Sequence, residues 1–129
     1  MQLYTISKIE AVHQLAMLGL SEIVVDDNVG WYTTEAEWRP ILLAAATGLP
    51  DYEPDRFDCD KFVISVMAYV YKHYRLNGLG IMRGKNSIGG YHAWLAYATE
   101  HGIRFFEPQT KEFFKPGEKG LVPDTYGIT

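Results

Sequence analysis

The 129-residue sequence has little cysteine, no block of basic residues and no long apolar run. A single cysteine cannot form an internal disulfide, which excludes a small secreted scaffold held by disulfides. The twelve Lys and Arg residues are scattered and the formal net charge is -4. Nucleic acid is therefore not expected as the main partner, because binding its backbone requires clustered cations. No window approaches the ~20 consecutive apolar residues that a membrane span requires.

No signal peptide is recognisable near the N-terminus. The apolar stretch "AVHQLAMLGL" contains His13 and Gln14, follows Glu10 and lacks a basic lead-in. We therefore expect a protein that is cytoplasmic or associated with a phage or virion, with neither a membrane nor a nucleic acid as its partner. The sequence leaves the oligomeric state open.

Apolar and aromatic residues are plentiful, at 47% and 14% of the chain, so the sequence can form a substantial core. The length is that of one ordinary domain. We expect residues 1–129 to form a single domain.

Helical periodicity dominates the first part of the chain. Pro40 suits the first position of a helix, and Asp58 suits an N-cap. Apolar residues in "KFVISVMAYVYKHY" recur at the spacings of a buried helical face. The sequence therefore predicts helices over residues 8–19, 40–47 and 59–76, with a short β-branched strand over residues 23–25.

The period of the pattern changes in the last third of the chain. "YHAWLAYAT" and "IRFFEP" are typical of two strands, joined by "EHG" in a hairpin with Gly102 at its turn. We interpret the glycine-rich residues 77–90 as a loop, and residues 112–129 as turns with one further short strand. Helices followed by an antiparallel sheet indicate an α+β fold, with the N-terminal helices packed on the C-terminal sheet.

Three chemically active side chains meet in this arrangement. Cys59 opens the third helix, where unpaired backbone N–H groups favour a thiolate. His92 begins one strand of the hairpin and Glu107 ends the other, so the two are expected side by side. A nucleophile, a base and an orienting carboxylate are the parts of thiol catalysis, and their chain order is that of papain-like enzymes. Each residue alone also has an ordinary structural interpretation: a small buried hydrophobe, a core histidine and a solvated carboxylate.

Short motifs around these residues resemble a known family. "FDCDKF", "GYHAW" and "FEPQT" are similar to the C-terminal domain of the mushroom agglutinins, a calcium-dependent, papain-like cysteine protease domain. The likeness covers residues 50–110. It implies a papain-like fold in which Cys59 is the nucleophile, His92 the general base and Glu107 the orienting acid.

The resemblance also implies a calcium ion. Asp58 and Asp60 flank the thiol and Asp55 precedes it. Carboxylates next to a thiol raise its pKa, and a divalent cation bound between them would remove that effect. Carboxylate oxygens are ligands that calcium prefers, although the spacing is not that of an EF-hand loop. We expect Asp55, Asp58 and Asp60 as the ligands.

The glutamine that helps papain-like enzymes to hold the oxyanion has no counterpart in "YEPDRFD". The backbone N–H of Cys59 can supply one donor, and Arg56, Gln109 or Trp38 can supply another. The sequence does not choose among these three.

The function expected from these residues is that of a cysteine hydrolase. It would cleave an amide bond of a peptide or protein through an acyl-enzyme on Cys59, with calcium assistance. One alternative is a bacterial cell-wall amidase or endopeptidase, which uses a related set of residues. Another is a non-catalytic accessory or structural protein that keeps the fold, in which case the missing glutamine reflects lost activity.

Overall fold

The computed structural model describes residues 1–127, which form three helices and eight strands in an α+β arrangement. The helices are α1 (Lys8–Ala16), α2 (Glu35–Ala46) and α3 (Cys59–Tyr74). The strands are β1 (Tyr4–Ser7), β2 (Glu22–Ile23), β3 (Val29–Tyr32), β4 (Leu79–Lys85), β5 (Tyr91–Thr99), β6 (Gly102–Glu107), β7 (Glu112–Phe114) and β8 (Val122–Gly127). The α+β class predicted from the sequence is confirmed. No helix within residues 1–127 has the length and apolar character of a membrane span.

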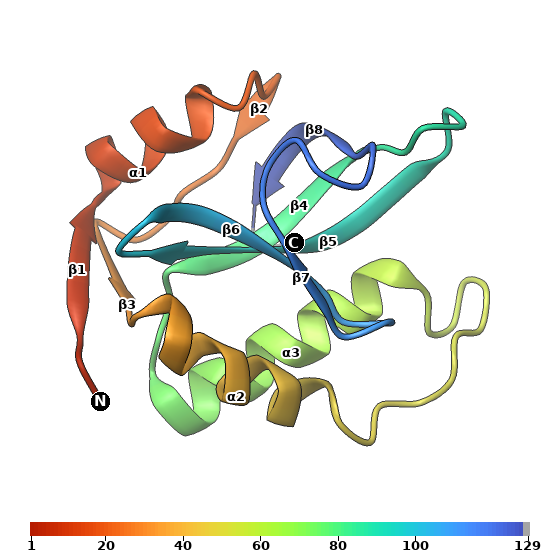
Figure 1. Ribbon diagram of the computed structural model, residues 1–129, viewed down its shortest axis with the longest axis horizontal. Coiled ribbons are helices and arrows are strands. Elements are labelled where there is room, and N and C mark those ends of the chain that lie inside the picture. The colour runs from red at the N-terminus through yellow and green to blue at the C-terminus, as the bar shows by residue number, and fades with distance from the viewer. Residues whose placement is uncertain (128–129) are drawn as a thin grey trace.

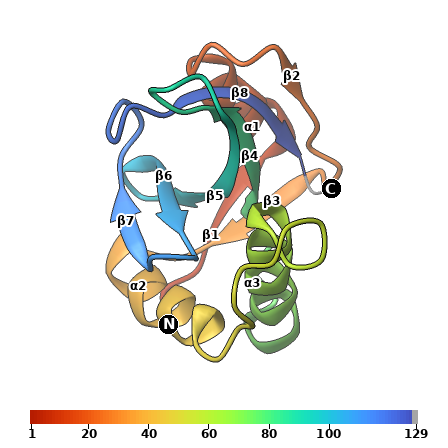
Figure 2. The same cartoon turned by 90° about the vertical axis from the view of Figure 1, so that its right-hand side faces the viewer.

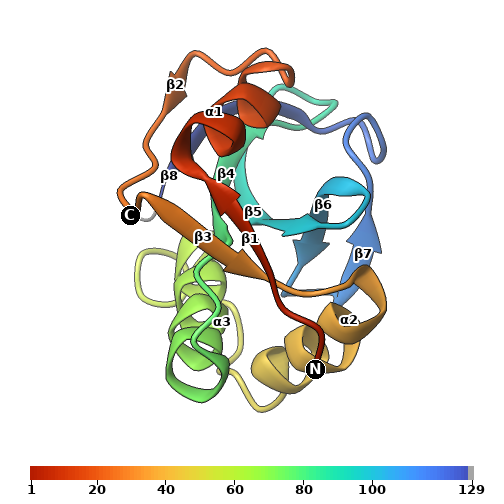
Figure 3. The same cartoon turned by 90° about the vertical axis from the view of Figure 1, so that its left-hand side faces the viewer.

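Six of the strands form one sheet in the order β2-β8-β4-β5-β6-β7. All neighbours in this sheet are antiparallel except β2 and β8, which run parallel, so the predicted purely antiparallel sheet is corrected to a mixed one. β1 and β3 form a separate antiparallel pair. Figure 3 shows this pair between α1 and the two other helices.

The large sheet is covered on both faces. α2 and α3 lie below it in Figure 1, and α1 lies above. Figure 2 shows the strands of the large sheet forming a curve, with α2 and α3 outside it and below. Each face has its own apolar core, one built mainly with α2 and α3 and the other with Leu15 of α1.

Strand β5 contributes to both cores, which explains its unbroken apolar sequence. Ala93, Leu95 and Tyr97 face α2 and α3, whereas Trp94 and Ala96 face the core with Leu15. Side chains alternate between the faces of a strand, and a strand buried on both faces needs apolar residues at every position. Strand β5 therefore lies between the two cores and contributes side chains to both.

Residues 79–85, which we interpreted as loop, form strand β4 between β5 and β8. Its two glycines misled the prediction, because glycine usually weakens a strand. Here close packing requires them. A Cβ atom on Gly84 would lie 2.0 Å from the carbonyl oxygen of Val122, and one on Gly80 would lie 2.5 Å from the ring of Tyr126.

Helix α2 begins at Glu35, earlier than the predicted start at Pro40. The hydroxyl of Thr34 accepts a hydrogen bond from the backbone N–H of Glu37 at 3.1 Å, which caps the helix. Pro40 therefore lies inside the helix. A proline there removes one helical hydrogen bond, a cost that the burial of Trp38 and Leu42 offsets.

The other predicted boundaries differ from the structure by a few residues. α1 ends at Ala16 instead of residue 19, α3 ends at Tyr74 instead of residue 76, and the predicted strand at 23–25 extends only over Glu22–Ile23. The expected final strand is β8. Residues 128 and 129, which the prediction included, lie outside the described residues.

Candidate functional site

Cys59 is the first residue of α3, as predicted, and Asp58 occupies the N-cap position with an extended backbone. The Asp58 side chain makes no capping hydrogen bond. The first turn of α3 therefore keeps backbone N–H groups beside the thiol, and these groups favour negative charge. Cys59 is half-buried against the core that α2 and α3 share with the sheet.

The hairpin brings His92 and Glu107 together, which confirms the predicted neighbourhood. β5 and β6 are antiparallel with Leu95 opposite Phe106, so the first residues of β5 lie beside the last residues of β6. Nε2 of His92 hydrogen-bonds Oε1 of Glu107. The carboxylate thus fixes the orientation of the ring and leaves its other nitrogen for Cys59.

The imidazole and the thiol form a hydrogen-bonded pair. The hydrogen bond with His92 lowers the pKa of Cys59, and the backbone N–H of Ala93 lowers it further, against the effect of burial. The same hydrogen bond, followed by that of Glu107, raises the pKa of His92 to about 9. The two shifts describe one interaction, because the hydrogen bond favours the thiolate of Cys59 and the imidazolium of His92.

The acidic residues around the thiol are neutralised by nearby cations of the chain. Nζ of Lys61 lies 3.6 Å from Asp58 and 3.3 Å from Asp60, and the Arg83 guanidinium lies 4.0 Å from Asp60. Asp60 still raises the pKa of Cys59, but this is the weakest of the contributions. The charge compensation that we expected from a metal ion is supplied by a lysine and an arginine.

The predicted calcium ligands do not gather at one point. Asp55 is exposed in a turn with φ +64°, while Asp58 and Asp60 face Lys61. Within residues 1–127 no group of three or more His, Cys, Asp or Glu side chains is arranged to hold a metal ion. These residues therefore do not fit a calcium site, and calcium stays an untested prediction.

Two of the three expected oxyanion donors lie elsewhere. Trp38 is fully buried, and its indole N–H donates to the carbonyl of Ala98 at 2.8 Å. Arg56 is exposed and pairs with Glu53 at 3.2 Å. Only Gln109 is near the cluster, where its backbone N–H donates to Glu107 at 3.3 Å.

Ala93 was not among the residues predicted for the site, yet its backbone N–H hydrogen-bonds the sulfur of Cys59. The position of Ala93 directly after His92 is the one feature of the sequence that indicates this role.

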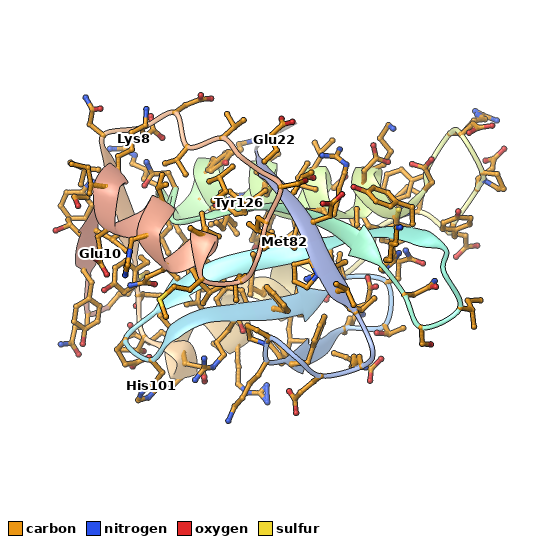
Figure 4. The ribbon with its side chains drawn as sticks, turned by 90° about the horizontal axis from the view of Figure 1, so that it is seen from above. Lys8, Glu10, Glu22, Met82, His101 and Tyr126 are labelled. Carbon is orange, nitrogen blue, oxygen red and sulfur yellow. The ribbon has the colours of Figure 1, made fainter. Side chains whose placement is uncertain are left out.

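A second polar site, the α2–β7 groove, was not anticipated. It has a volume of about 470 Å³, and side chains of α2, the β5–β6 turn and β7 line it, chiefly Glu35, Arg39, Glu100, His101, Arg104 and Phe113. His101 marks the β5–β6 turn in Figure 4. No sequence motif could have indicated this groove, because three distant segments form it.

Polar contacts inside the groove hold most of its charged groups in place. Arg104 Nε lies 3.0 Å from Glu35, and a carboxylate oxygen of Glu100 accepts the backbone N–H of Glu35 at 2.8 Å. The guanidinium of Arg39 lies over the ring of Phe113, 4.3 Å from its centre. Within residues 1–127 Arg39 has no acidic partner, so its charge is available to a ligand.

Neither this groove nor the apolar cavity described below is lined by Cys59, His92 or Glu107. The cluster predicted as catalytic therefore lies outside both of these recesses.

The chain matches no family model and no curated protein in sequence, but solved structures share its fold. One is described as the PSL1a–E64 complex, with a TM-score of 0.74 and 20% identity over 95% of this chain and 50% of that one. Another is Polyporus squamosus lectin bound to the human-type influenza-binding epitope Neu5Acα2-6Galβ1-4GlcNAc, with a TM-score of 0.72 and 21% identity over 92% of this chain and 48% of that one. The chain spans about half the length of these structures.

These comparisons correct the expected identity and activity. One of the similar proteins is described as a lectin bound to a carbohydrate epitope, which points to carbohydrate binding. The predictions of a papain-like protease-domain family, of a cysteine hydrolase and of a peptide or protein substrate are therefore wrong on this finding, and the non-catalytic alternative fits better. At 20–21% identity the likeness shows the shared fold.

Proposed function

We propose that the protein is non-catalytic and binds carbohydrate through the α2–β7 groove, while retaining a papain-like fold. The main support for this proposal is the guanidinium of Arg39, which lies over the ring of Phe113 and has no acidic partner among residues 1–127. The likeness to a lectin bound to a sialylated epitope supports the class of ligand.

The groove offers the two kinds of contact that a sugar requires. The apolar C–H face of a sugar ring can lie on an aromatic ring such as Phe113, and its hydroxyls can bond fixed charged side chains. Glu35 and Arg104 are already oriented by their ion pair, so little entropy is lost when a ligand binds.

Arg39 directs the proposal toward acidic sugars. A planar guanidinium forms paired hydrogen bonds with a carboxylate, and these are among the strongest in proteins. A sialic acid carries one carboxylate on its ring. The ligand class proposed is therefore a glycan that ends in sialic acid.

The cluster of Cys59, His92 and Glu107 has a structural role in this proposal. Its hydrogen bonds join the first turn of α3 to β5 and β6. In the papain-like fold that we propose, these hydrogen bonds tie the helical layer to the sheet.

Isothermal titration calorimetry tests the proposal. We expect binding of the trisaccharide Neu5Acα2-6Galβ1-4GlcNAc, with the neutral disaccharide that lacks Neu5Ac binding at least about tenfold more weakly. Arg39→Ala should reduce the affinity for the trisaccharide to that of the disaccharide. Arg56→Ala, which removes an exposed arginine outside the groove, is the matched control and should bind as the wild type does. Failure of the wild type to bind either sugar would refute the proposal.

A further inference from the structure

An apolar cavity lies between α1 and the sheet, on the face opposite α2 and α3. Its volume is about 330 Å³, and its inner wall is formed by small and aliphatic side chains, among them Ala11, Leu15, Ala96, Ala98 and Ile103. We call it the α1 cavity. It does not touch Cys59, His92 or the charged side chains of the α2–β7 groove.

The size and lining of the α1 cavity suit a small molecule. Ligand pockets typically have volumes of roughly 300–1,000 Å³ and are mostly apolar with a few polar groups. An apolar cavity of about 150 Å³ already holds a benzene ring in another protein. The α1 cavity therefore has room for an apolar body of ring or chain size.

One end of the α1 cavity is polar. Tyr126 of β8 reaches it, with the tip of its ring over Gly80. Burial raises the pKa of the Tyr126 hydroxyl, with a smaller effect from Tyr71, and no hydrogen bond from residues 1–127 contributes. Tyr126 is half-buried, so its hydroxyl can bond a polar group of a ligand in the cavity.

The mouth beside this end is acidic. Asp26 and Asp27 line it together with Tyr71, and Lys8 lies at the start of α1. Two carboxylates against one ammonium leave the mouth with a net charge of -1 from these groups. Figure 4 shows Lys8 and Tyr126 on the α1 side of the sheet, beside the segment that follows β2.

Asp27 is held in place at the mouth. One of its oxygens accepts a hydrogen bond from the amide of Asn77 at 2.7 Å. Burial and then the charge of Asp27 raise the pKa of the Tyr71 hydroxyl, so the carboxylate lies within electrostatic reach of the polar end. Among residues 1–127 the other oxygen of Asp27 has no hydrogen-bond donor, so it can accept from a cation.

We propose that the α1 cavity binds a small apolar amine, with its chain among the aliphatic side chains and its ammonium between Asp27 and the hydroxyls of Tyr71 and Tyr126. An ammonium has three donors and no acceptor, which suits a carboxylate and two hydroxyls. The site shares only Tyr97 with the lining of the proposed carbohydrate groove and does not depend on that groove.

Calorimetry with three probes of one chain length tests the proposal: octylamine, 1-octanol and octanoate. We expect octylamine to bind about tenfold more tightly than octanol, because a hydrogen bond to a charged group adds roughly that factor. Octanoate should bind most weakly, since Asp26 and Asp27 repel it. Equal affinity for the three probes, or no binding of octylamine, would overturn the proposal.

Variants separate the polar end from the apolar wall. Tyr126→Phe keeps the ring and removes the hydroxyl, so it should fold normally and bind octylamine several-fold more weakly. Asp27→Asn should reduce octylamine affinity to the level of octanol. Ala96→Leu should fill the cavity and abolish binding of octylamine and of octanol, with the thermal midpoint as a check that the variant folds.

Arg39→Ala serves as the control for independence from the carbohydrate groove and should leave octylamine binding unchanged. If Tyr126→Phe and Asp27→Asn both bind octylamine as the wild type does, the ammonium is not held at this end and the proposal fails.

Discussion

At the scale of single residues, Cys59 shows how flanking charges and hydrogen bonds compete. Two aspartates beside a thiol predict a raised pKa, yet the His92 and Ala93 hydrogen bonds lower it. The hydrogen bond with His92 changes the pKa of the thiol more than the aspartates do, because Lys61 already compensates the charges of Asp58 and Asp60. The lowered pKa of the thiol follows from this local balance and does not imply that the protein is a catalyst.

Alkylation of Cys59 measures the balance directly. We expect the iodoacetamide rate to reach half its maximum well below pH 8.5, the approximate value of a free cysteine. His92→Ala should move the midpoint back toward that value, because the main cause of the shift is lost. A wild-type profile that rises only near pH 8.5 would show that no thiolate pair exists.

Folding stability should report the pKa of His92. The pKa of about 9 in the folded protein lies above the ordinary 6.5. The stabilisation is therefore complete below about pH 6.5 and is lost as the pH rises through 9. Urea unfolding should show an advantage of about 2 kcal/mol for the wild type over His92→Gln near pH 6. An advantage that does not shrink between pH 7 and pH 10 would contradict the assignment.

At the scale of elements, the sequence predicted those helices and strands whose formation depends on residues close together in the chain. The β5–β6 hairpin and the start of α3 at Cys59 follow from local turn and capping signals, and the structure has both. Strand β4 could not be predicted, because its glycines are explained only by residues of β8, which lies far later in the chain. The early start of α2 was indicated by Thr34 and obscured by Pro40.

Gly84→Ala tests the reason for the glycine in β4. The new methyl group would lie 2.0 Å from a carbonyl oxygen of β8, so one strand must move. We expect a loss of about 3 kcal/mol in the free energy of unfolding. Gly127→Ala is the matched control, since its methyl group would meet only Val24 at 3.8 Å. Equal stability of the two variants would show that β4 and β8 are not packed as described.

At the scale of the whole molecule, the sequence did not predict the groove and the cavity, because each is formed by segments far apart in the chain. His92 and Glu107 were found because one hairpin carries both, whereas the α2–β7 groove joins three segments and the α1 cavity joins strands, helix and loop. The likeness to a lectin structure rests on the fold at 20–21% identity, whereas the short motifs suggested the protease domain of the mushroom agglutinins. The location in a cytoplasm or virion, and the single domain of residues 1–129, stay predictions.

Backbone amide shifts of the ¹⁵N-labelled protein, titrated with Neu5Acα2-6Galβ1-4GlcNAc, test the central claim most directly. We expect saturable shifts that cluster on α2 around Arg39 and on β7 around Phe113, with the resonances of α3 unchanged. No saturable shift at the groove, or shifts centred instead on Cys59 and His92, would contradict it.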